Sequence, residues 1–378
     1  MTSPRRSEED RSASIDLSVP LEEVWSYRQP HVPALPVVEE GLVFFGDSQR
    51  HTTAIAEESR KKLWQSEGTL APLGWWSGFL LGYAPDNQHL RLIEAQSGRT
   101  SRETGVPGGC VYCGADARWV AGAGYGEQWT IWCLDPGEAK LLWSTVLEKG
   151  VHVAGVGPLL AGDTVVIALD NGEVRAWHAE TGKPRWASTL ADLSWRRMSG
   201  QVEPGTARGR ASVRGNRIFF NVTDHHVAAL DLEDGSRSWT WGGPPFVIRD
   251  GQVRGDNYYA LGWAGEYRIL DAANGLERFA INLQRQLPRG APVTLAPPLL
   301  VTESHILAGS EQGNVTAFGR DNGKFTWTYR PKATGSTIAG DNQFVVGNHR
   351  IYYGDATFRI RCLAPGGTKP AKAARRKR

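Results

Sequence analysis

The chain has 378 residues, of which 40% are hydrophobic, 10% aromatic and 22% charged. A chain of this length buries about three quarters of the surface of its unfolded state, so core size is not limiting. Its 43 basic and 40 acidic residues give a net charge of +3, and six of the basic residues lie in the last ten positions. The basicity therefore belongs to the C-terminal tail. The sequence contains no run of 18 apolar residues, so it predicts no membrane-spanning helix.

The first residues predict no packed structure. Residues 1–16 are rich in Ser, Arg, Glu and Asp and lack the apolar run of a secretory signal. We therefore expect a disordered N-terminal segment over residues 1–20. We also expect a cytoplasmic protein, provided that this is the native N-terminus.

From residue 24 onward the chain alternates short apolar runs with polar turns. Residues 24–27 form the first run, residues 42–45 and 53–56 follow, and the same pairing returns at 258–261 and 267–270. Short β-branched or aromatic runs between Gly, Asn and Asp are typical of antiparallel strands. No stretch shows sustained helical periodicity, so the sequence predicts an all-β fold.

One phrase recurs seven times: a strand, a tight polar turn, and a large residue four positions after the turn slot. The turn slots are Arg60, Gly98, Ala139, Gly182, Gly235, Gly275 and Gly323, and the large residues are Trp64, Arg102, Trp143, Trp186, Trp239, Phe279 and Trp327. A constant phrase at an irregular period of about 40 residues indicates a repeat array. About four strands per repeat make one blade of a β-propeller.

The two ends of the chain complete one another. Residues 351–354 and 358–362 form an eighth strand pair with no closing aromatic strand after it. Residues 24–27 look like a closing strand with no blade before it. We predict an eight-bladed β-propeller of four-stranded antiparallel blades over residues 21–367, with the N-terminal strand closing the last blade. Residues 368–378 are then a basic C-terminal tail.

The recurring phrase resembles the pyrroloquinoline-quinone (PQQ) type propeller repeat, Ala-x-Asp-x-x-Thr-Gly-x-x-x-Trp, over residues 24–367. Asp135, Asp231 and Asp271 fill the Asp position of that repeat. The residues that depart from it are Ala56, Glu94, His178, Gly319 and Ala364. In that family the Trp packs on the neighbouring blade, so the resemblance implies a structural role for these tryptophans.

The same resemblance implies an enzyme class as an alternative. PQQ-dependent dehydrogenases hold their quinone in an axial funnel with calcium, an acidic base and a vicinal disulfide. This sequence has no adjacent Cys-Cys pair, no Ser/His/Asp signature and no Gly-rich phosphate loop. We therefore predict no enzymatic activity, no catalytic residue, no cofactor and no metal site, and we keep a PQQ-dependent oxidoreductase as an alternative.

The four cysteines fall into two pairs. Cys133 and Cys362 occupy equivalent positions in their repeats, where other copies have alanine, and are expected to pack inside strands. Cys110 and Cys113 form a C-x-x-C motif that resembles half of a zinc knuckle. A structural zinc site needs four ligands, and a redox C-x-x-C normally joins a strand to a helix. A reduced surface turn is the favoured interpretation, with metal or redox chemistry as the alternative.

Two connections between blades, residues 191–210 and 283–295, are longer than the repeat requires. Both join one blade to the next, so both should emerge on the same face. Trp and Arg are enriched at interface hot spots, so we predict a partner-binding rim there. Its residues are Trp195, Arg196, Arg197, Arg208, Arg285 and Arg289. The alternative is that Trp195 packs on its own blade and that Arg196 and Arg197 are solvated.

The sequence therefore predicts a non-catalytic scaffold for protein–protein interaction. In blade number and repeat pattern the chain also resembles the propeller subunit of the outer-membrane β-barrel assembly machinery, which is an exported lipoprotein. The expected cytoplasmic location argues against transferring that role. A further alternative is a nucleic-acid-associated protein that uses the basic tail, although a solvated flexible end is the favoured interpretation of that tail.

Overall fold

The structure, a computed structural model, describes most of the chain. The described residues are 15–28, 36–46, 51–85, 88–155, 157–196, 199–223, 225–242, 248–262, 265–289, 291, 294–310, 313–332, 344–355 and 359–366. The chain divides into two compact units, unit 1 with residues 1–82, 93–101 and 286–378, and unit 2 with residues 83–92 and 102–285. The described residues contain no α-helix, and none of their elements is a helix long and apolar enough to cross a membrane.

Unit 1 holds three four-stranded antiparallel sheets. The first is β2 (Val37–Glu39), β3 (Leu42–Gly46), β4 (Thr52–Ala56) and β5 (Lys62–Gln65). The second is β28 (Leu295–Val301), β29 (His305–Ser310), β30 (Val315–Gly319) and β31 (Phe325–Tyr329). The third has the order β1-β34-β33-β32, from β1 (Leu21–Arg28), β34 (Arg359–Pro365), β33 (Arg350–Asp355) and β32 (Val345–Gly347).

Another four-stranded sheet takes its residues from both units. Its strands are β6 (Ala71–Trp76), β7 (Phe79–Ala84), β8 (His89–Glu94) and β9 (Thr100–Gly105).

Unit 2 holds four further four-stranded sheets, each in chain order. They are β10 (Tyr112–Ala115), β11 (Val120–Tyr125), β12 (Trp129–Asp135) and β13 (Lys140–Val146); β14 (Leu159–Ala161), β15 (Thr164–Ala168), β16 (Glu173–His178) and β17 (Pro184–Thr189); β20 (Ala207–Arg214), β21 (Arg217–Val222), β22 (His226–Asp231) and β23 (Arg237–Gly242); and β24 (Ile248–Arg254), β25 (Asn257–Gly262), β26 (Glu266–Asp271) and β27 (Glu277–Asn282). The unit also contains the two-stranded sheet of β18 (Trp195–Arg196) and β19 (Val202–Glu203). A short 3₁₀ helix, η2 (Leu283–Gln286), follows β27.

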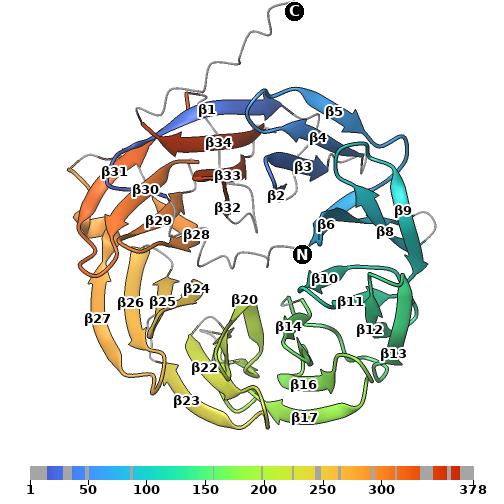
Figure 1. The fold of residues 1–378 in the computed structure, drawn as a ribbon. Helices are drawn as coiled ribbons and strands as arrows, with labels where there is room; N and C mark the ends of the chain where they lie inside the picture. The colour runs from blue at the N-terminus through green and yellow to red at the C-terminus, as the bar shows by residue number, and fades with distance from the viewer. Residues whose placement is uncertain are drawn as a thin grey trace, which may run out of the picture. The chain divides into compact units, whose positions relative to one another are not determined.

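The described residues thus form eight four-stranded antiparallel blades, and the prediction of an eight-bladed β-propeller is confirmed. The N-terminal strand completes the last blade as predicted, because β1 pairs antiparallel with β34 (Figure 1). At this junction Glu23 accepts hydrogen bonds from the Tyr329 hydroxyl at 2.7 Å and from Arg361 Nη1 at 2.5 Å. Burial alone would raise the pKa of Glu23, but these two partners hold it below its ordinary value.

The middle strands of the blades are continuous hydrophobic runs. All five residues of β15 are buried, whereas β13, on the outside of its sheet, has none. A strand with sheets packed on both faces has no solvent side, so alternation of polar and apolar residues disappears. This packing places the core between neighbouring blades.

The closing tryptophans carry the contacts between neighbouring blades. Five of them donate their indole N–H to a carbonyl oxygen outside their own sheet. The pairs are Trp64 with Ala95 (2.8 Å), Trp143 with Ala179 (2.7 Å), Trp186 with Leu232 (2.9 Å), Trp239 with Ala272 (3.1 Å) and Trp327 with Leu17 (2.9 Å). In the first four pairs the acceptor is the first turn residue of the next copy. The structural role implied by the PQQ-like resemblance is therefore observed.

The turn glycines are required for two separate reasons. Gly182 has φ of +67°, and a Cβ added there would lie 2.6 Å from Cγ of Trp143. The same close approach occurs for Gly98, Gly235 and Gly275. Where the preceding closing residue is Arg102 instead of Trp, the turn slot is Ala139, which still has a positive φ of +53°.

In seven of the blades, the closing residue faces a partner of complementary size on the neighbouring strand. Tryptophan faces alanine or cysteine, and the smaller Phe279 faces the larger Ile269. The small-residue pairs are Trp25 with Cys362, Trp64 with Ala54, Trp143 with Cys133, Trp186 with Ala176, Trp239 with Ala229 and Trp327 with Ala317. Cys133 and Cys362 are both 0% exposed, so their predicted packing role is confirmed.

Two features of unit 1 were not predicted. Residues 15–20 belong to the segment expected to be disordered, yet Ile15 and Leu17 are buried in a core cluster, so the packed region begins before residue 21. The buried carboxylate of Glu57, 2% exposed, accepts hydrogen bonds from the Tyr352 hydroxyl and from Asn348 at 2.5 Å, and it pairs with Arg350 at 3.2 Å. These contacts join the last blade to the first.

Candidate functional site

The long connection between β17 and β20 in unit 2 folds into a small β-hairpin. Its strands β18 and β19 pair antiparallel, with Trp195 opposite Glu203 and Arg196 opposite Val202. Nη1 of Arg196 donates to the carbonyl oxygen of Gly200 at 3.3 Å. The connection that the sequence marked as unusually long therefore carries regular secondary structure.

Trp195 lies on a histidine of the next blade. Its ring stacks on the imidazole of His225, with centroids 3.7 Å apart and planes inclined by 30°. His225 is 7% exposed and lies in the turn between β21 and β22, whereas Trp195 is half-buried. The stack fixes the orientation of the indole and leaves part of its surface accessible. Trp195 therefore packs on the following blade rather than on its own, and part of its ring stays exposed.

Hydrogen bonds fix the point where the hairpin returns to β20. The Thr206 N–H donates to Oγ1 of Thr223 at 2.7 Å, and the Thr223 N–H donates to the Thr206 carbonyl at 2.8 Å. The Thr223 hydroxyl donates to the Pro204 carbonyl at 3.2 Å. A Cβ at Gly205 would lie 2.0 Å from the carbonyl oxygen of Leu190, so only glycine fits this return. The hairpin is held on a defined base.

An ion pair ties the start of the connection to β23. Asp192 lies 2.8 Å from Nη2 of Arg237, and this hydrogen bond lowers the pKa of Asp192. Burial and the neighbouring His225 lower the pKa of His226, so His226 is predominantly neutral at pH 7. His226 therefore adds little positive charge beside the hairpin, which carries exposed Arg196.

Two of the predicted arginines lie in this connection, exposed to solvent. Arg196 is exposed on β18, and Arg208 is exposed at the start of β20, where the pairing with β21 skips residues before Ser212. Val202, opposite Arg196, is 50% exposed. We call Trp195, Arg196, Val202 and Arg208 the Trp195 surface. The predicted residue Arg197 lies outside the described residues.

The remaining two predicted arginines come from different units. Arg285 is exposed in η2 of unit 2, and its backbone N–H donates to Oδ1 of Asn282 at 3.1 Å. Arg289 is exposed in unit 1. Their membership of one rim with the Trp195 surface stays a prediction.

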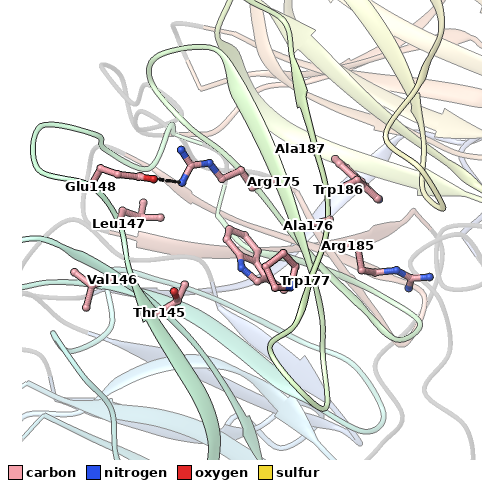
Figure 2. A pocket seen from close by; sticks show the side chains of 11 residues that line it. Thr145, Val146, Leu147, Glu148, Arg175, Ala176, Trp177, Arg185, Trp186 and Ala187 are labelled. Atoms are coloured by element: carbon pink, nitrogen blue, oxygen red, sulfur yellow. Dashed lines mark hydrogen bonds and ion pairs between the residues drawn. The ribbon is translucent and has the colours of Figure 1, made fainter.

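A second candidate is a cavity of about 330 Å³ in unit 2, lined by residues of β13, β16 and β17 and by the chain after β13. Figure 2 shows its main polar contact, the ion pair between Glu148 and Arg175, near the ring of Trp177. Arg175 also pairs with Glu173 at 2.6 Å, and Arg185 pairs with Asp163 at 2.5 Å. These charges are already compensated, so the lining offers an apolar surface flanked by ion pairs.

The described part of the chain contains no cluster of metal-binding side chains. No group of three or more His, Cys, Asp or Glu side chains there is placed to hold a metal ion. Cys110 and Cys113 are half-buried free thiols. Burial raises the pKa of both Cys133 and Cys362 to about 12. The basic tail, residues 368–378, lies outside the described residues.

The sequence marked Trp195, Arg196 and Arg208 as candidates but did not reveal what holds Trp195 in place. His225 carries the indole from a turn about 30 residues further along the chain. The adjacent residues His225 and His226 are visible in the sequence, but only the fold places His225 against the long connection. The cavity beside Trp177 was also missed, because its walls are ordinary repeat residues.

Comparison with known proteins identifies the family of this chain. Residues 127–359 match a family model described as "Outer membrane protein assembly factor BamB". Proteins of that name are 33% identical over 101 residues in Escherichia coli (26% of this chain, 24% of the relative) and 24% identical over 252 residues in Burkholderia pseudomallei (56% and 64%). The matches thus span from a quarter to just under two thirds of these relatives' lengths.

Solved structures share the fold at low identity. BamB from Moraxella catarrhalis has a TM-score of 0.66 at 15% identity, covering 92% of this chain and 99% of that one. Saccharomyces cerevisiae Sqt1 has a TM-score of 0.67 at 12% identity, covering 91% and 99%. A computationally designed protein, Ika8, has a TM-score of 0.67 at 12% identity, covering 89% and 97%. At these identities the likeness shows the propeller fold alone.

Proposed function

Because the chain belongs to the family described as outer membrane protein assembly factor BamB, we propose that it is a non-catalytic scaffold for protein–protein interaction whose partner binds at the Trp195 surface. The family supports a role in assembly rather than in chemistry. Propellers present their function on the connections between strands, because the blades hold those connections in place.

One observation carries the choice of surface: Trp195 is held on His225 but is only half-buried. Ordering a free side chain on binding costs about 0.5–1.5 kcal/mol, and a ring that is already stacked avoids part of this cost. Tryptophan and arginine are the side chains most enriched among residues that dominate binding energy. A preoriented indole on a hairpin that also carries an exposed arginine is therefore a suitable anchor.

The charge of the surface indicates the chemistry of the partner. Arg196 and Arg208 are exposed, whereas Asp192 is neutralised by Arg237. A protein segment with an apolar side chain for Trp195 and carboxylates for the arginines would complement this surface. Binding through exposed charges weakens as ionic strength rises, since the Debye length falls to about 3 Å at 1 M salt.

The test is affinity capture from the native cells with the full chain and two variants. The site variant is Trp195→Ala with Arg196→Ala and Arg208→Ala. The control variant is Lys183→Ala with Leu276→Ala, which removes an exposed charge and an exposed apolar side chain from other turns of unit 2. Each preparation is first checked for equal urea stability.

We expect the control variant to capture the same protein as the wild type, and the site variant to lose it. A protein retained equally by both variants would refute the Trp195 surface but keep the scaffold. If neither the wild type nor the control enriches any protein, the scaffold function is refuted.

A further inference from the structure

Cys110 folds back toward Cys113 although the two residues lie on an extended part of the chain. The Cys110 thiol donates to the carbonyl oxygen of Tyr112 at 3.5 Å, so its sulfur lies beside the peptide bond that joins Tyr112 to Cys113. The neighbouring Cys113 thiol raises the pKa of Cys110, in keeping with their proximity. Both cysteines are half-buried rather than enclosed in the core. Nothing in the proposed scaffold function uses this pair.

A local bulge produces this arrangement. The N–H of Val111 donates to the carbonyl of Ala123 at 2.8 Å, while Tyr112 is the residue paired with Ala123 in the β10–β11 ladder. Two residues therefore oppose one, which bends the chain at Val111. A straight strand would hold Cα atoms three residues apart at about 10 Å, whereas a disulfide needs about 4.4–6.8 Å. The bend at Val111 shortens this separation, and the Cys110 sulfur already reaches the carbonyl of Tyr112.

Glycines allow the chain to enter the bend. Gly108 and Gly109 have φ of +68° and +79°. A Cβ at Gly109 would lie 2.3 Å from the hydroxyl oxygen of Tyr83, and one at Gly124 would lie 2.3 Å from the carbonyl of Gly109. The segment before Cys110 is thus closely packed on its neighbours, so the position of Cys110 is set by the fold.

We infer that Cys110 and Cys113 are a redox site that closes reversibly to an intramolecular disulfide by exchange with a small disulfide such as oxidised glutathione. One protein thiolate attacks the small disulfide and releases the first reduced thiol. The second protein sulfur then attacks the mixed disulfide and releases the other. The protein loses two electrons and two protons, and one small disulfide becomes two thiols.

The environment of the pair favours the closed form once it has formed. The neighbouring Cys113 thiol and burial both raise the pKa of Cys110, so a thiolate at Cys110 is disfavoured. Dithiol proteins become strong oxidants when their reduced thiolate is stabilised, and the opposite environment makes the disulfide the more persistent state. Cys110 is also the poorer nucleophile, so the first attack falls to Cys113.

Closing the ring would fix the edge of an aromatic cluster. Val111, between the two cysteines, is 52% exposed, and Tyr112 stacks on Trp129 with centroids 6.0 Å apart. Tyr125, 51% exposed, contacts Trp129 and stacks on His152, and Trp129 Nε1 donates to Nδ1 of His152 at 3.1 Å. The redox state of the pair therefore sets the mobility of Val111 and Tyr112 at this surface.

The test is thiol counting on the folded full chain. The protein is reduced, incubated with excess oxidised glutathione, quenched with acid, unfolded and alkylated, and its intact mass is measured. The reduced protein should take up four alkyl groups, one for each cysteine in the sequence. We expect the treated protein to take up two, with no glutathione attached, and to recover four after a dithiol reductant. Peptide mapping should find Cys133 and Cys362 alkylated in both samples.

The single variants Cys110→Ser and Cys113→Ser separate this chemistry from general oxidation. Each variant should lose the two-thiol closure and retain at most one glutathione adduct. In the wild type, stable glutathione adducts on both cysteines, or uptake of four alkyl groups after prolonged treatment, would overturn the inference. Tryptophan fluorescence should change on closure in the wild type and stay constant in both variants; no change in the wild type would overturn the link to the aromatic cluster.

Discussion

Replacing Gly182 with alanine tests whether the repeat's glycine is selected by the tryptophan that docks on it. The position has φ of +67°, and the added Cβ would lie 2.6 Å from Cγ of Trp143. The left-handed conformation alone costs a non-glycine residue about 1–2 kcal/mol. Overpacking against the ring adds about 1–3 kcal/mol, or the indole withdraws and loses its 2.7 Å hydrogen bond to Ala179. We expect a total loss of about 3 kcal/mol.

Gly162→Ala is the matched control for the backbone contribution. Gly162 lies in the same blade with φ of +60°, and a Cβ there would meet nothing within 4 Å. Its substitution should therefore cost only about 1 kcal/mol. Urea unfolding followed by circular dichroism would report both losses as shifts in midpoint at constant slope.

The double variant Trp143→Ala with Gly182→Ala gives the coupling between the two positions. Once the ring is removed, Gly182→Ala should cost no more than the Gly162→Ala control, because only the backbone contribution remains. Equal losses for Gly182→Ala with and without the ring would refute the docking argument. Equal losses for Gly182→Ala and Gly162→Ala in the wild-type background would refute it as well.

Four other substitutions test single contacts by the same unfolding assay. Glu57→Ala leaves buried polar partners without their carboxylate and should cost about 3–5 kcal/mol, so a loss below 1 kcal/mol would contradict the ion-pair assignment. The pKa of Glu23 is lowered in the folded state, so the contribution of its carboxylate to stability is present above about pH 4.5 and is lost as the pH falls further. The difference in unfolding free energy between wild type and Glu23→Gln should therefore shrink in acid. A difference that stays constant with pH would contradict this. Trp25 has a buried indole N–H without a partner among the described residues, so Trp25→Phe should be nearly neutral, whereas Trp143→Phe should cost about 1–3 kcal/mol.

The sequence was sufficient to predict the blades because each blade repeats one set of local requirements. Most closing tryptophans have a small residue opposite them, a glycine in the following turn and a carbonyl acceptor in the next copy of the repeat. Two exceptions fit the same pattern, since Arg102 is followed by Ala139 and Phe279 faces Ile269, whereas Trp25 is followed by Arg60. Such requirements are local or one repeat apart, so a single sequence displays them.

The support of the candidate site could not be predicted, because it depends on contacts that no repeat imposes. Trp195 and His225 meet only once a unique connection folds over a particular turn. The bend that brings Cys110 toward Cys113 depends on a bulge opposite Ala123, which residue spacing does not reveal. Glu57 occupies a turn position where no other copy has a carboxylate, and its partners come from residues about 290 positions further along the chain, as the pairs with Asn348 (291) and Tyr352 (295) show.

The pairing of β1 with β34 has a consequence for the order in which the protein is made. Glu23 and Arg361, which meet in that blade, are 338 residues apart in sequence. At synthesis rates of about 5–20 residues per second, the first strand waits about 20 to 70 seconds for its partner. Most of unit 2 is a continuous segment, 102–285, whose four complete sheets are all translated before that moment. The middle of the propeller therefore has time to fold before the last blade is assembled from a strand that precedes it and strands that follow it.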